Sequence, residues 1–358
     1  MRIVQLRAQN FRLFETLSLQ THCRLNFIFG ANAAGKTSLL EALYTLGRGK
    51  SFRGSTPGEL AGVAGRHWLV FGRVEAADTE PRHRVGVRWQ DGVGQVRVDG
   101  QAARNLDLLR LLPVQVLEPG MHRMLQEGPS YRRSFLDWGV FHVEPSFLPT
   151  WSRYRRALRQ RNQALRQNAS DRELAVWEPE LAEAGERLDA LRRTHLADIG
   201  PTVQDHVRVL LDEGEWNFEL LSGWGQGLAL REALLRQRTA DRRLGTTQAG
   251  PHRAELRVRA GGHGIRHRIS RGQQKLLIAA LLLAQCTVIG RSAGRYPVLL
   301  VDDFGAELAE RYQATLLAAL VRYPGQVFVT AFERSGVLAT VADAALFHVE
   351  RGVLRPDS

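Results

Sequence analysis

The segment "LNFIFGANAAGKTSLLEALYTLG", Leu25–Gly47, decides the fold of this chain. Its first residues, "LNFIFG", form a short apolar run that predicts a buried strand, and "TSLLEALYTLG" has the spacing of an amphipathic helix that ends at Gly47. Between them stands "GANAAGKT", a phosphate-binding loop in the strand-to-helix context that such a loop requires. Its backbone N–H groups and the positive end of the helix dipole favour bound phosphate.

The loop predicts a nucleotide site with a division of roles. We expect Lys36 to reach the β- and γ-phosphates as a catalytic residue and the Thr37 hydroxyl to bind Mg²⁺. The predicted nucleotide-binding residues of the loop are Gly30, Ala31, Asn32, Ala33, Ala34, Gly35, Lys36, Thr37 and Ser38.

An acidic partner for this loop stands in the last quarter of the chain. In "VLLVDD", four apolar residues predict a buried parallel strand that carries Asp302 and Asp303 at its carboxyl end. We expect Asp302 to support the metal and Asp303 to orient or deprotonate the attacking water. One α/β head is therefore split in sequence, and its two halves must meet to complete the site.

The rest of the chain fits this division. Antiparallel strands are predicted in "HWLVFGRV", "HRVGVRW" and "QVRV", and strands alternate with helices from Val298 onward. Between them, an arginine-rich helical region has apolar residues at seven-residue spacing on both sides of "QNASD", which predicts a short coiled-coil-like helical hairpin. We predict an α/β P-loop head formed by residues 1–119 and 250–358, with a helical arm domain, residues 120–249, inserted.

The charge of the chain indicates a polyanionic partner. The 358 residues carry a net charge of +12, which makes nucleic acid the first candidate, bound through its phosphates and without sequence preference. An arginine-rich helix face can equally be a solvated surface. The predicted DNA contacts are Arg132, Arg133, Arg153, Arg155, Arg156, Arg159 and Arg161.

Lysine is rare in this basic chain. It occurs three times among 49 basic residues, at Lys36, Lys50 and Lys275, and the others are arginine. This skew is typical of a genome-wide compositional bias. Lys36 and Lys275, which stand in motifs, then indicate positions where arginine does not replace lysine, whereas Lys50 is equally explained by chance.

Other features predict a cytoplasmic location. The N-terminal residues lack an apolar signal core, and the longest apolar run, "LLIAALLLAQCTVI" from Leu276, is too short to span a bilayer and predicts a buried helix. The two cysteines lack metal-ligand spacing, which suits a reducing compartment.

A third motif, "SRGQQK", Ser270–Lys275, precedes that apolar run. A serine followed by glycine at a helix N-terminus presents a hydroxyl and free N–H groups to an anion, although a serine there can also be a simple helix cap.

Together these motifs resemble one family over nearly the whole chain. With "NFR" at Asn10–Arg12, "YRRSFLDWGVFHVEP" at Tyr131–Pro145, "AGPHRAEL" at Ala249–Leu256 and "VDDFGAEL" at Val301–Leu308, the sequence is similar to the RecF family, an SMC-like branch of the ABC-type ATPases in bacterial recombinational repair. The resemblance implies an ABC-type head that binds ATP and Mg²⁺ and dimerises with ATP.

The resemblance also implies roles for single residues. Ser270 and Gly272 resemble the ABC signature, which contacts the γ-phosphate bound by a second subunit. Gln115 stands where a catalytic, metal-coordinating glutamine is expected, Asp303 replaces the catalytic glutamate, and Arg12 is counted among the nucleotide-binding residues.

The biological implications of the resemblance reach further. It implies binding of duplex DNA, gapped DNA or single-strand/double-strand junctions, loading of recombinase on single strands, partners RecR and RecO, and links to replication-fork recovery and the SOS response. Ala309 replaces a usual acid, and Thr330 stands where transporters carry a histidine. The missing acid and the shorter carboxylate of Asp303 both predict a weak, DNA-stimulated ATPase whose slow hydrolysis acts as a timer.

Two alternatives remain at this point. The phosphate loop and signature also suit the ATPase subunit of an ABC membrane transporter, and the charge alone suits a purely structural DNA-binding protein. DNA-stimulated ATP hydrolysis without a membrane subunit distinguishes the first alternative, and absence of ATP binding would favour the second.

Overall fold

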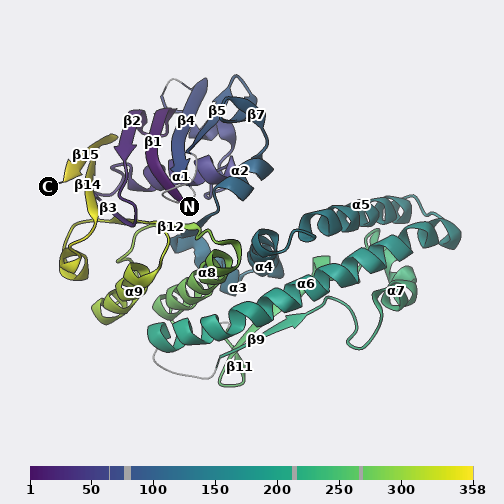
Figure 1. Ribbon diagram of the computed structural model, residues 1–358. Helices are drawn as coiled ribbons and strands as arrows, with labels where there is room; N and C mark the ends of the chain where they lie inside the picture. Colours follow the sequence, from purple (N-terminus) through teal and green to yellow (C-terminus); the bar gives the residue numbers. More distant parts are fainter. Residues whose placement is uncertain (64, 76–81, 212–215, 266–268, 358) are drawn as a thin grey trace. The chain divides into compact units, whose positions relative to one another are not determined.

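The computed structural model describes residues 1–63, 65–75, 82–211, 216–265 and 269–357 (Figure 1). The chain forms two compact units. The first comprises residues 1–122, 209–211 and 271–358, and the second comprises residues 123–208 and 212–270. The predicted class, an α/β head interrupted by a helical insertion, is confirmed.

A mostly parallel sheet is the centre of the first unit. Its strand order is β15-β14-β3-β13-β12-β8, in which only β15 runs antiparallel to its neighbour. All residues of β3, β12 and β13 are buried, as expected for strands covered on both faces. The strands are β3 (Leu25–Phe29), β8 (Val114–Leu117), β12 (Val298–Val301), β13 (Val327–Ala331), β14 (Ala345–Glu350) and β15 (Val353–Asp357).

This strand order answers how the two halves of the head meet. Strands β3 and β12 are parallel and flank β13, so the residues that follow them reach the same edge of the sheet. The phosphate loop follows β3 and the two aspartates follow β12. The split site is therefore assembled by strand pairing between the two ends of the chain.

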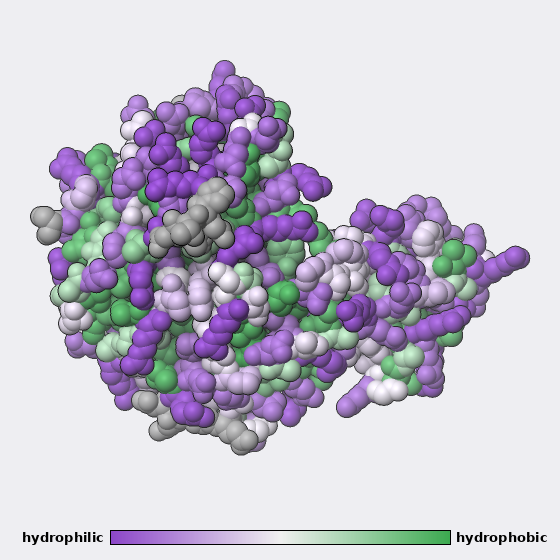
Figure 2. Space-filling view, in the orientation of Figure 1, coloured by the Kyte–Doolittle hydropathy of each residue, from purple (hydrophilic) through white to green (hydrophobic). Residues whose placement is uncertain are grey.

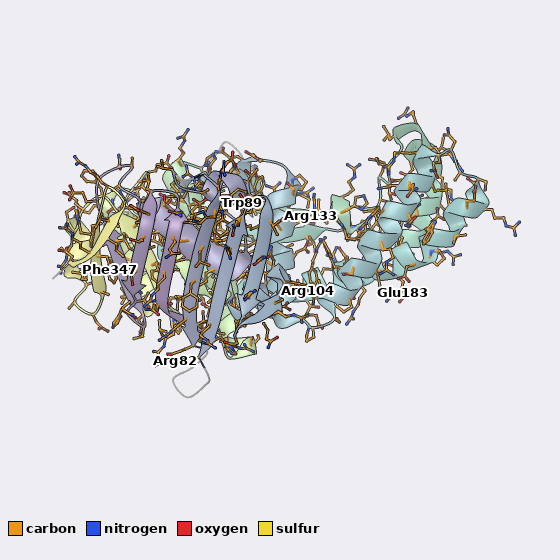
Figure 3. All side chains as sticks on the ribbon, turned by 90° about the horizontal axis from the view of Figure 1, so that it is seen from above. Arg82, Trp89, Arg104, Arg133, Glu183 and Phe347 are labelled. Atoms are coloured by element: carbon orange, nitrogen blue, oxygen red, sulfur yellow. The ribbon has the colours of Figure 1, made fainter. Side chains whose placement is uncertain are left out.

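The second sheet of this unit is antiparallel, in the order β2-β1-β4-β5-β6-β7. The predicted meander is β4, β5 and β6, and its strands run side by side in Figure 3, where Trp89 of β5 is labelled. Asp91 and Asp99 have positive φ at the turns that join β5 to β6 and β6 to β7, as Asp-Gly hairpins require. The strands are β1 (Arg2–Phe11), β2 (Phe14–Gln20), β4 (His67–Glu75), β5 (His83–Gln90), β6 (Val93–Val98) and β7 (Gln101–Ala103).

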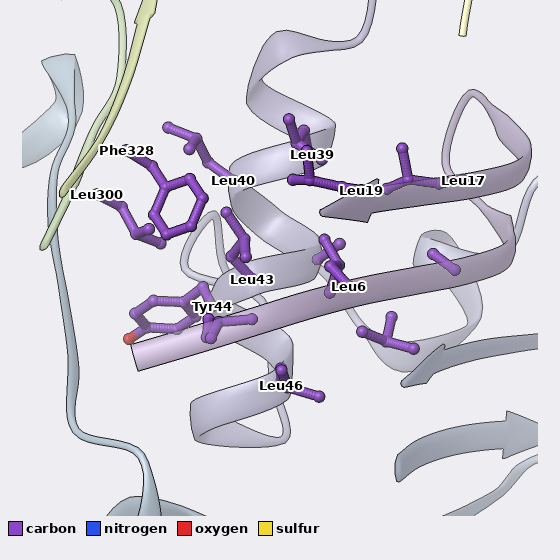
Figure 4. Packing of buried hydrophobic residues seen from close by; sticks show 14 of the residues in the cluster. Leu6, Leu17, Leu19, Leu39, Leu40, Leu43, Tyr44, Leu46, Leu300 and Phe328 are labelled. Carbon is purple, nitrogen blue, oxygen red and sulfur yellow. The ribbon is translucent and has the colours of Figure 1, made fainter. Parts of the chain in front are cut away.

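Helix α1 (Lys36–Arg48) joins the two sheets into one core. Its leucines Leu39 and Leu43 pack in one cluster with Leu6 of the antiparallel sheet and with Leu300 and Phe328 of the parallel sheet (Figure 4). All five side chains are fully buried. Because α1 begins with the lysine of the phosphate loop, this core fixes the loop in place. The remaining helical segments of the unit are η1 (Pro57–Leu60), α2 (Asn105–Leu111), η2 (Pro119–His122), α8 (Arg271–Ala293), α9 (Glu310–Arg322) and η4 (Gly336–Thr340).

Helix α8 contains the long apolar run. Among the described residues, it is the one helix long and apolar enough to cross a membrane, and 72% of that window is buried inside the protein. Its residues from Gln274 to Cys286 are all buried. The prediction of a buried helix is therefore confirmed, and the core helix of a soluble protein passes the same membrane test.

The second unit is built on a helical hairpin. Helices α5 (Phe147–Arg166) and α6 (Asp171–Leu211) run side by side in Figure 1, joined at the predicted break. The predicted heptad leucines Leu158, Leu181 and Leu188 are buried together with Leu230 of α7. The other elements are α3 (Arg123–Gln126), α4 (Pro129–Val143), α7 (Leu230–Leu244), η3 (Pro251–Arg253), β9 (Trp216–Leu221), β10 (Glu255–Ala260) and β11 (His263–Gly264).

The predicted domain boundary at residue 249/250 is wrong. Strand β9, inside the region predicted to be purely helical, pairs with β10 along its whole length from Trp216 to Leu221. This pairing holds residues 250–270 in the second unit rather than in the head. The second unit also begins at Arg123, a few residues after the predicted start of the arm.

Candidate nucleotide-binding site

The phosphate loop has the backbone that its glycines permit. Gly30 and Gly35 have φ of 154° and 121°, and a Cβ at Gly30 would lie 2.3 Å from the carbonyl oxygen of Val349. The Lys36 ammonium donates to the carbonyl oxygens of Gly30 at 2.6 Å and Ala31 at 2.9 Å. Burial lowers the pKa of Lys36, and the nearby carboxylates of Asp303 and Asp302 oppose this shift. The predicted cation is thus held at the start of α1.

The loop and the acidic strand meet at Asp302. The Thr37 hydroxyl lies 3.1 and 3.0 Å from the two oxygens of this carboxylate and donates to it. Thr330, on β13, donates its hydroxyl to Asp302 at 2.8 Å and accepts the backbone N–H of Asp303 at 2.9 Å. The start of α1 and strand β13, which are distant in sequence, therefore both contact the carboxylate that follows β12.

Asp302 is suited to a cation. It is 6% exposed, and burial raises its pKa, against the hydrogen bonds from Thr330 and Thr37 that lower it. A bound cation would favour the charged carboxylate. A threonine hydroxyl and a carboxylate are hard oxygen donors of the type that Mg²⁺ takes in addition to substrate phosphates. Thr37 and Asp302 thus fit Mg²⁺.

These groups open onto a cavity of about 900 Å³ in the first unit, a size typical of a small-ligand site. Asp303, which is exposed and has a φ of 52°, lies in its wall. Of the loop residues predicted to bind nucleotide, the described wall includes Asn32, Ala33, Gly35, Lys36, Thr37 and Ser38, but not Gly30, Ala31 or Ala34. The other wall residues are Arg12, Leu13, Arg53, Glu59, Ala61, Gly62, Val63, Glu118, Pro119, Gly120 and Asp302.

Arg12 lies in the cavity wall, but its guanidinium already has protein partners. Its Nε and Nη2 donate to the buried carboxylate of Glu41 at 2.7 and 2.8 Å, and its Nη1 donates to the Glu59 carbonyl at 2.8 Å. Glu41 also accepts the hydroxyl of Ser51. Arg12 therefore connects β1 to α1 and to the cavity rim.

The structure does not bring Gln115 to the described wall of the cavity. Gln115 pairs with Leu299, inside β12, so it lies short of the strand end where the aspartates stand. Its side chain is 8% exposed and donates to Gln285 of α8 at 3.4 Å. Glu118, the residue after β8, lies in the cavity wall instead. The sequence did not predict this, because which residue of this segment reaches the wall depends on the register between β8 and β12.

The signature residues lie outside this cavity. Ser270 is exposed and directly precedes α8, and Gly272 is half-buried in the first turn. The cavity wall, among the described residues, includes neither.

Two of the predicted DNA contacts are wrong because the side chains are buried in ion pairs. Arg161 is fully buried against Asp241 and Glu178. Arg132 is 8% exposed and binds both oxygens of Glu255 at 2.6 and 2.7 Å.

Two others have protein partners nearer the surface. Arg153 binds Glu180 and Glu183, and Arg133 donates to the Ala254 carbonyl at 2.9 Å. Arg133 and Glu183 are labelled in Figure 3.

Three more predicted contacts are exposed on α5, the helix that also carries Arg153. We call them the α5 arginines: Arg155, Arg156 and Arg159. The guanidinium of Arg155 stacks 5.1 Å from the centre of the Trp151 ring. Hydrophilic side chains also cover most of the face seen in Figure 2.

Sequence reasoning also missed what Thr330 and Arg53 do. Thr330 was noted only for the histidine it replaces, yet it is fully buried and holds both aspartates. Arg53 lies in the cavity wall, where its charge partly opposes the burial that raises the pKa of Asp302. Arg53 ends the stretch "GRGKSFR", which directly follows the predicted phosphate-loop helix. This closeness in sequence was the signal that could have placed Arg53 at the site.

Comparison with known proteins gives consistent matches. A family model described as "RecF/RecN/SMC N terminal domain" matches residues 2–355. The DNA replication and repair protein RecF of Thioalkalivibrio sulfidiphilus is 39% identical over 98% of both chains. The protein of the same name from Escherichia coli is 37% identical over 98% of this chain and 99% of its own length.

Solved structures agree with these matches. A structure titled as the recombination mediator protein RecF with ATP in the RecFOR pathway is 25% identical, with a TM-score of 0.87 over 99% of this chain and 97% of that one. An Smc head bound to a domain of ScpA shares the fold, with a TM-score of 0.62 over 100% of this chain and 97% of that one at 16% identity. These matches do not favour the alternative of a transporter subunit.

Proposed function

Because the chain belongs to the RecF family of DNA replication and repair proteins, we propose that two copies close on two ATP molecules, bind DNA and release it after slow hydrolysis. The observation that carries this proposal is the cavity in which Lys36, Thr37 and both aspartates converge from the two ends of the chain. The relatives whose structures were solved with ATP support ATP as the nucleotide.

Within one head, each group has a chemical task. Lys36 neutralises charge on the β- and γ-phosphates. Thr37 and Asp302 would hold a Mg²⁺ ion, which would supply positive charge to offset the negative charge that develops on the phosphates. Asp303, exposed in the cavity wall, orients the attacking water and accepts its proton. Thr330 holds Asp302 and the Asp303 backbone in place.

The second half of each site comes from the other copy. Ser270 and Gly272 do not line the cavity of their own chain, and they stand at the start of α8, where N–H groups suit an anion. We propose that they contact the γ-phosphate bound by the partner. Ala309 and the short carboxylate of Asp303 support weak, DNA-stimulated hydrolysis that acts as a timer.

We propose DNA as the polyanion that the charge of +12 favours, in duplex, gapped or junction form. The α5 arginines are candidate contacts because they are exposed. A related solved structure is that of a recombination mediator protein RecF in a RecFOR pathway, which supports RecO and RecR as partners. Recombinase loading, fork recovery, a role in the SOS response and a cytoplasmic location complete this proposal.

The test is ATP-dependent assembly. ATP that binds across two chains links nucleotide to dimerisation by mass action, so sedimentation equilibrium should show more dimer with ATP than with ADP or no nucleotide. Ser270→Arg places a bulky cation where the γ-phosphate of the partner needs a small donor. We expect it to abolish the ATP-dependent dimer and to leave ATP binding by the monomer nearly intact, because Lys36 and Thr37 are unchanged.

The matched control is Ser152→Arg, which adds the same cation at an exposed serine on α5. It should dimerise with ATP as the unmodified protein does. A Ser270→Arg protein that still dimerises with ATP would refute the shared-site proposal.

A further inference from the structure

Lys275 is buried in the first unit and forms an unusual set of hydrogen bonds. Its side chain is on α8 and 7% exposed. The ammonium donates to three backbone carbonyl oxygens, those of Asp303 at 2.9 Å, Phe304 at 3.3 Å and Ala306 at 3.0 Å. These bonds use all three N–H groups that an ammonium has.

The three carbonyls belong to the turn that follows β12. Asp303 and Glu307 have φ of 52° and 65°, a left-handed conformation that is uncommon for residues other than glycine. The fully buried ring of Phe304 anchors the turn, and its backbone N–H donates to the Thr330 carbonyl at 2.9 Å. Carbonyl dipoles that point at one centre repel each other, so the turn needs a cation at that centre.

The shape of the ammonium group explains why residue 275 is lysine and not arginine. An ammonium is a compact charge whose three hydrogens can each meet a different carbonyl, whereas the hydrogens of a guanidinium lie in one plane. In a chain whose basic residues are almost all arginine, Lys275 is one of three lysines. Lys36 likewise donates to two carbonyls of a tight loop.

The turn is held from two sides. On one side, Thr330 accepts the N–H of Asp303 and donates to Asp302, which in turn accepts the hydroxyl of Thr37. On the other side, Lys275 holds the carbonyl of Asp303 from α8. The position of the Asp303 carboxylate in the cavity wall therefore depends on where α8 begins.

We infer that Lys275 is a positioning residue, which keeps Asp303 at the nucleotide cavity and makes its position follow that of α8. This inference rests on the proposed function, in which Ser270, directly before α8, contacts the nucleotide of the partner. When that contact holds the start of α8, Lys275 holds Asp303 in its own cavity. Each subunit thereby connects the two ATP sites of the dimer.

The experiment compares Lys275→Met and Lys275→Arg with the unmodified protein. Equilibrium binding of a fluorescent ATP analogue should change by less than about 2-fold, because the variants leave Lys36, Thr37 and Asp302 in place. ATP-dependent dimerisation should persist. The kcat of DNA-stimulated hydrolysis should fall by about 10-fold or more in both variants, since small displacements of a catalytic group have effects of this size.

A rescue separates positioning from general support of the fold. In Lys275→Ala, added ethylammonium should restore kcat in a saturable way, because a free ammonium can occupy the carbonyl centre, whereas tetramethylammonium, which has no N–H, should not. The matched control is Lys50→Met, which removes the exposed lysine that follows α1 and should retain the kcat of the unmodified protein.

The outcomes distinguish the two proposals. If the unmodified protein does not dimerise with ATP, the proposed function is wrong. If it dimerises and Lys275→Met retains full kcat, the inference about Lys275 is wrong and the proposed function stands. Loss of ATP affinity in parallel with kcat, without amine rescue, would also overturn the inference, because Lys275 would then be a structural residue only.

Discussion

Replacing Arg161 with methionine tests whether this arginine stabilises the arm or faces nucleic acid. Its guanidinium donates to Asp241 at 2.7 Å, to Glu178 at 3.2 Å and to the Thr247 hydroxyl at 2.9 Å. Arg238 binds the other oxygen of Glu178 at 2.6 Å. Two buried carboxylates thus face two arginines, and the charges balance.

The expected cost follows from this balance. Arg161→Met leaves Glu178 with Arg238, but it leaves Asp241, which is fully buried, with a backbone N–H of Gln248 and no cation among these groups. Breaking a buried ion pair costs about 3–5 kcal/mol, whereas an exposed pair contributes at most about 1 kcal/mol. Adding Asp241→Asn removes the uncompensated charge and should recover at least half of the loss.

Tryptophan fluorescence during urea unfolding is a suitable assay. Trp68 and Trp89 lie in the first unit and the other five tryptophans lie in the second, so the signal reports mainly the unit that contains Arg161. The control is Arg153→Met on the same helix, which removes an exposed ion pair with Glu180. Equal stability of the two variants, or loss of DNA affinity in Arg161→Met without loss of stability, would refute this reasoning.

Three further results are expected. Lys36→Arg should lose productive ATP binding, because the broader guanidinium does not fit between the two loop carbonyls now 2.6 and 2.9 Å from the ammonium; wild-type ATP hydrolysis would contradict this. Replacing the α5 arginines with glutamine should flatten the slope of log K against log salt by about 0.9 for each lost phosphate contact in duplex DNA, and an unchanged slope in a binding titration would move the DNA surface elsewhere. Burial lowers the pKa of His195 and His252 to about 4, so the unfolded chain binds more protons between pH 6.5 and 4, and the second unit should lose up to about 3 kcal/mol per histidine as pH falls through this window. Fluorescence melting of that unit that is independent of pH between 7 and 5 would exclude this effect.

The nucleotide site was predictable where its signal is local. The phosphate loop, its strand and its helix are contiguous, and the apolar run before Asp302 specifies a buried strand without further information. Gln115 was harder to place because its distance from the cavity depends on pairing between β8 and β12, which local pattern does not encode. Strand β9 was not predicted for the same reason, because its partner β10 follows α7 and is distant in sequence.

The exposure of arginines could not be predicted from an arginine-rich helix. Arg159 is exposed and Arg161, two residues later on the same helix, is fully buried. The difference comes from Asp241, a carboxylate 80 residues away that only the folded arm brings near. The rarity of lysine, by contrast, singled out Lys275, and its ammonium donates to carbonyls of the turn after β12.

The strand order of the head sets a condition on synthesis at the ribosome. Strand β3, which precedes the phosphate loop, lies between β13 and β14, and its Phe27 pairs with Val329. The ribosome must therefore add roughly 300 residues after β3 before either neighbouring strand has been synthesised. At translation rates of about 5–20 residues per second, this delay is about 15 to 60 s. During that time the apolar strand β3 has neither of its neighbouring strands, and unpaired apolar strands are prone to aggregation. A chain that ends before Asp302 lacks the carboxylate that Thr37 contacts and therefore cannot complete the wall of the nucleotide cavity.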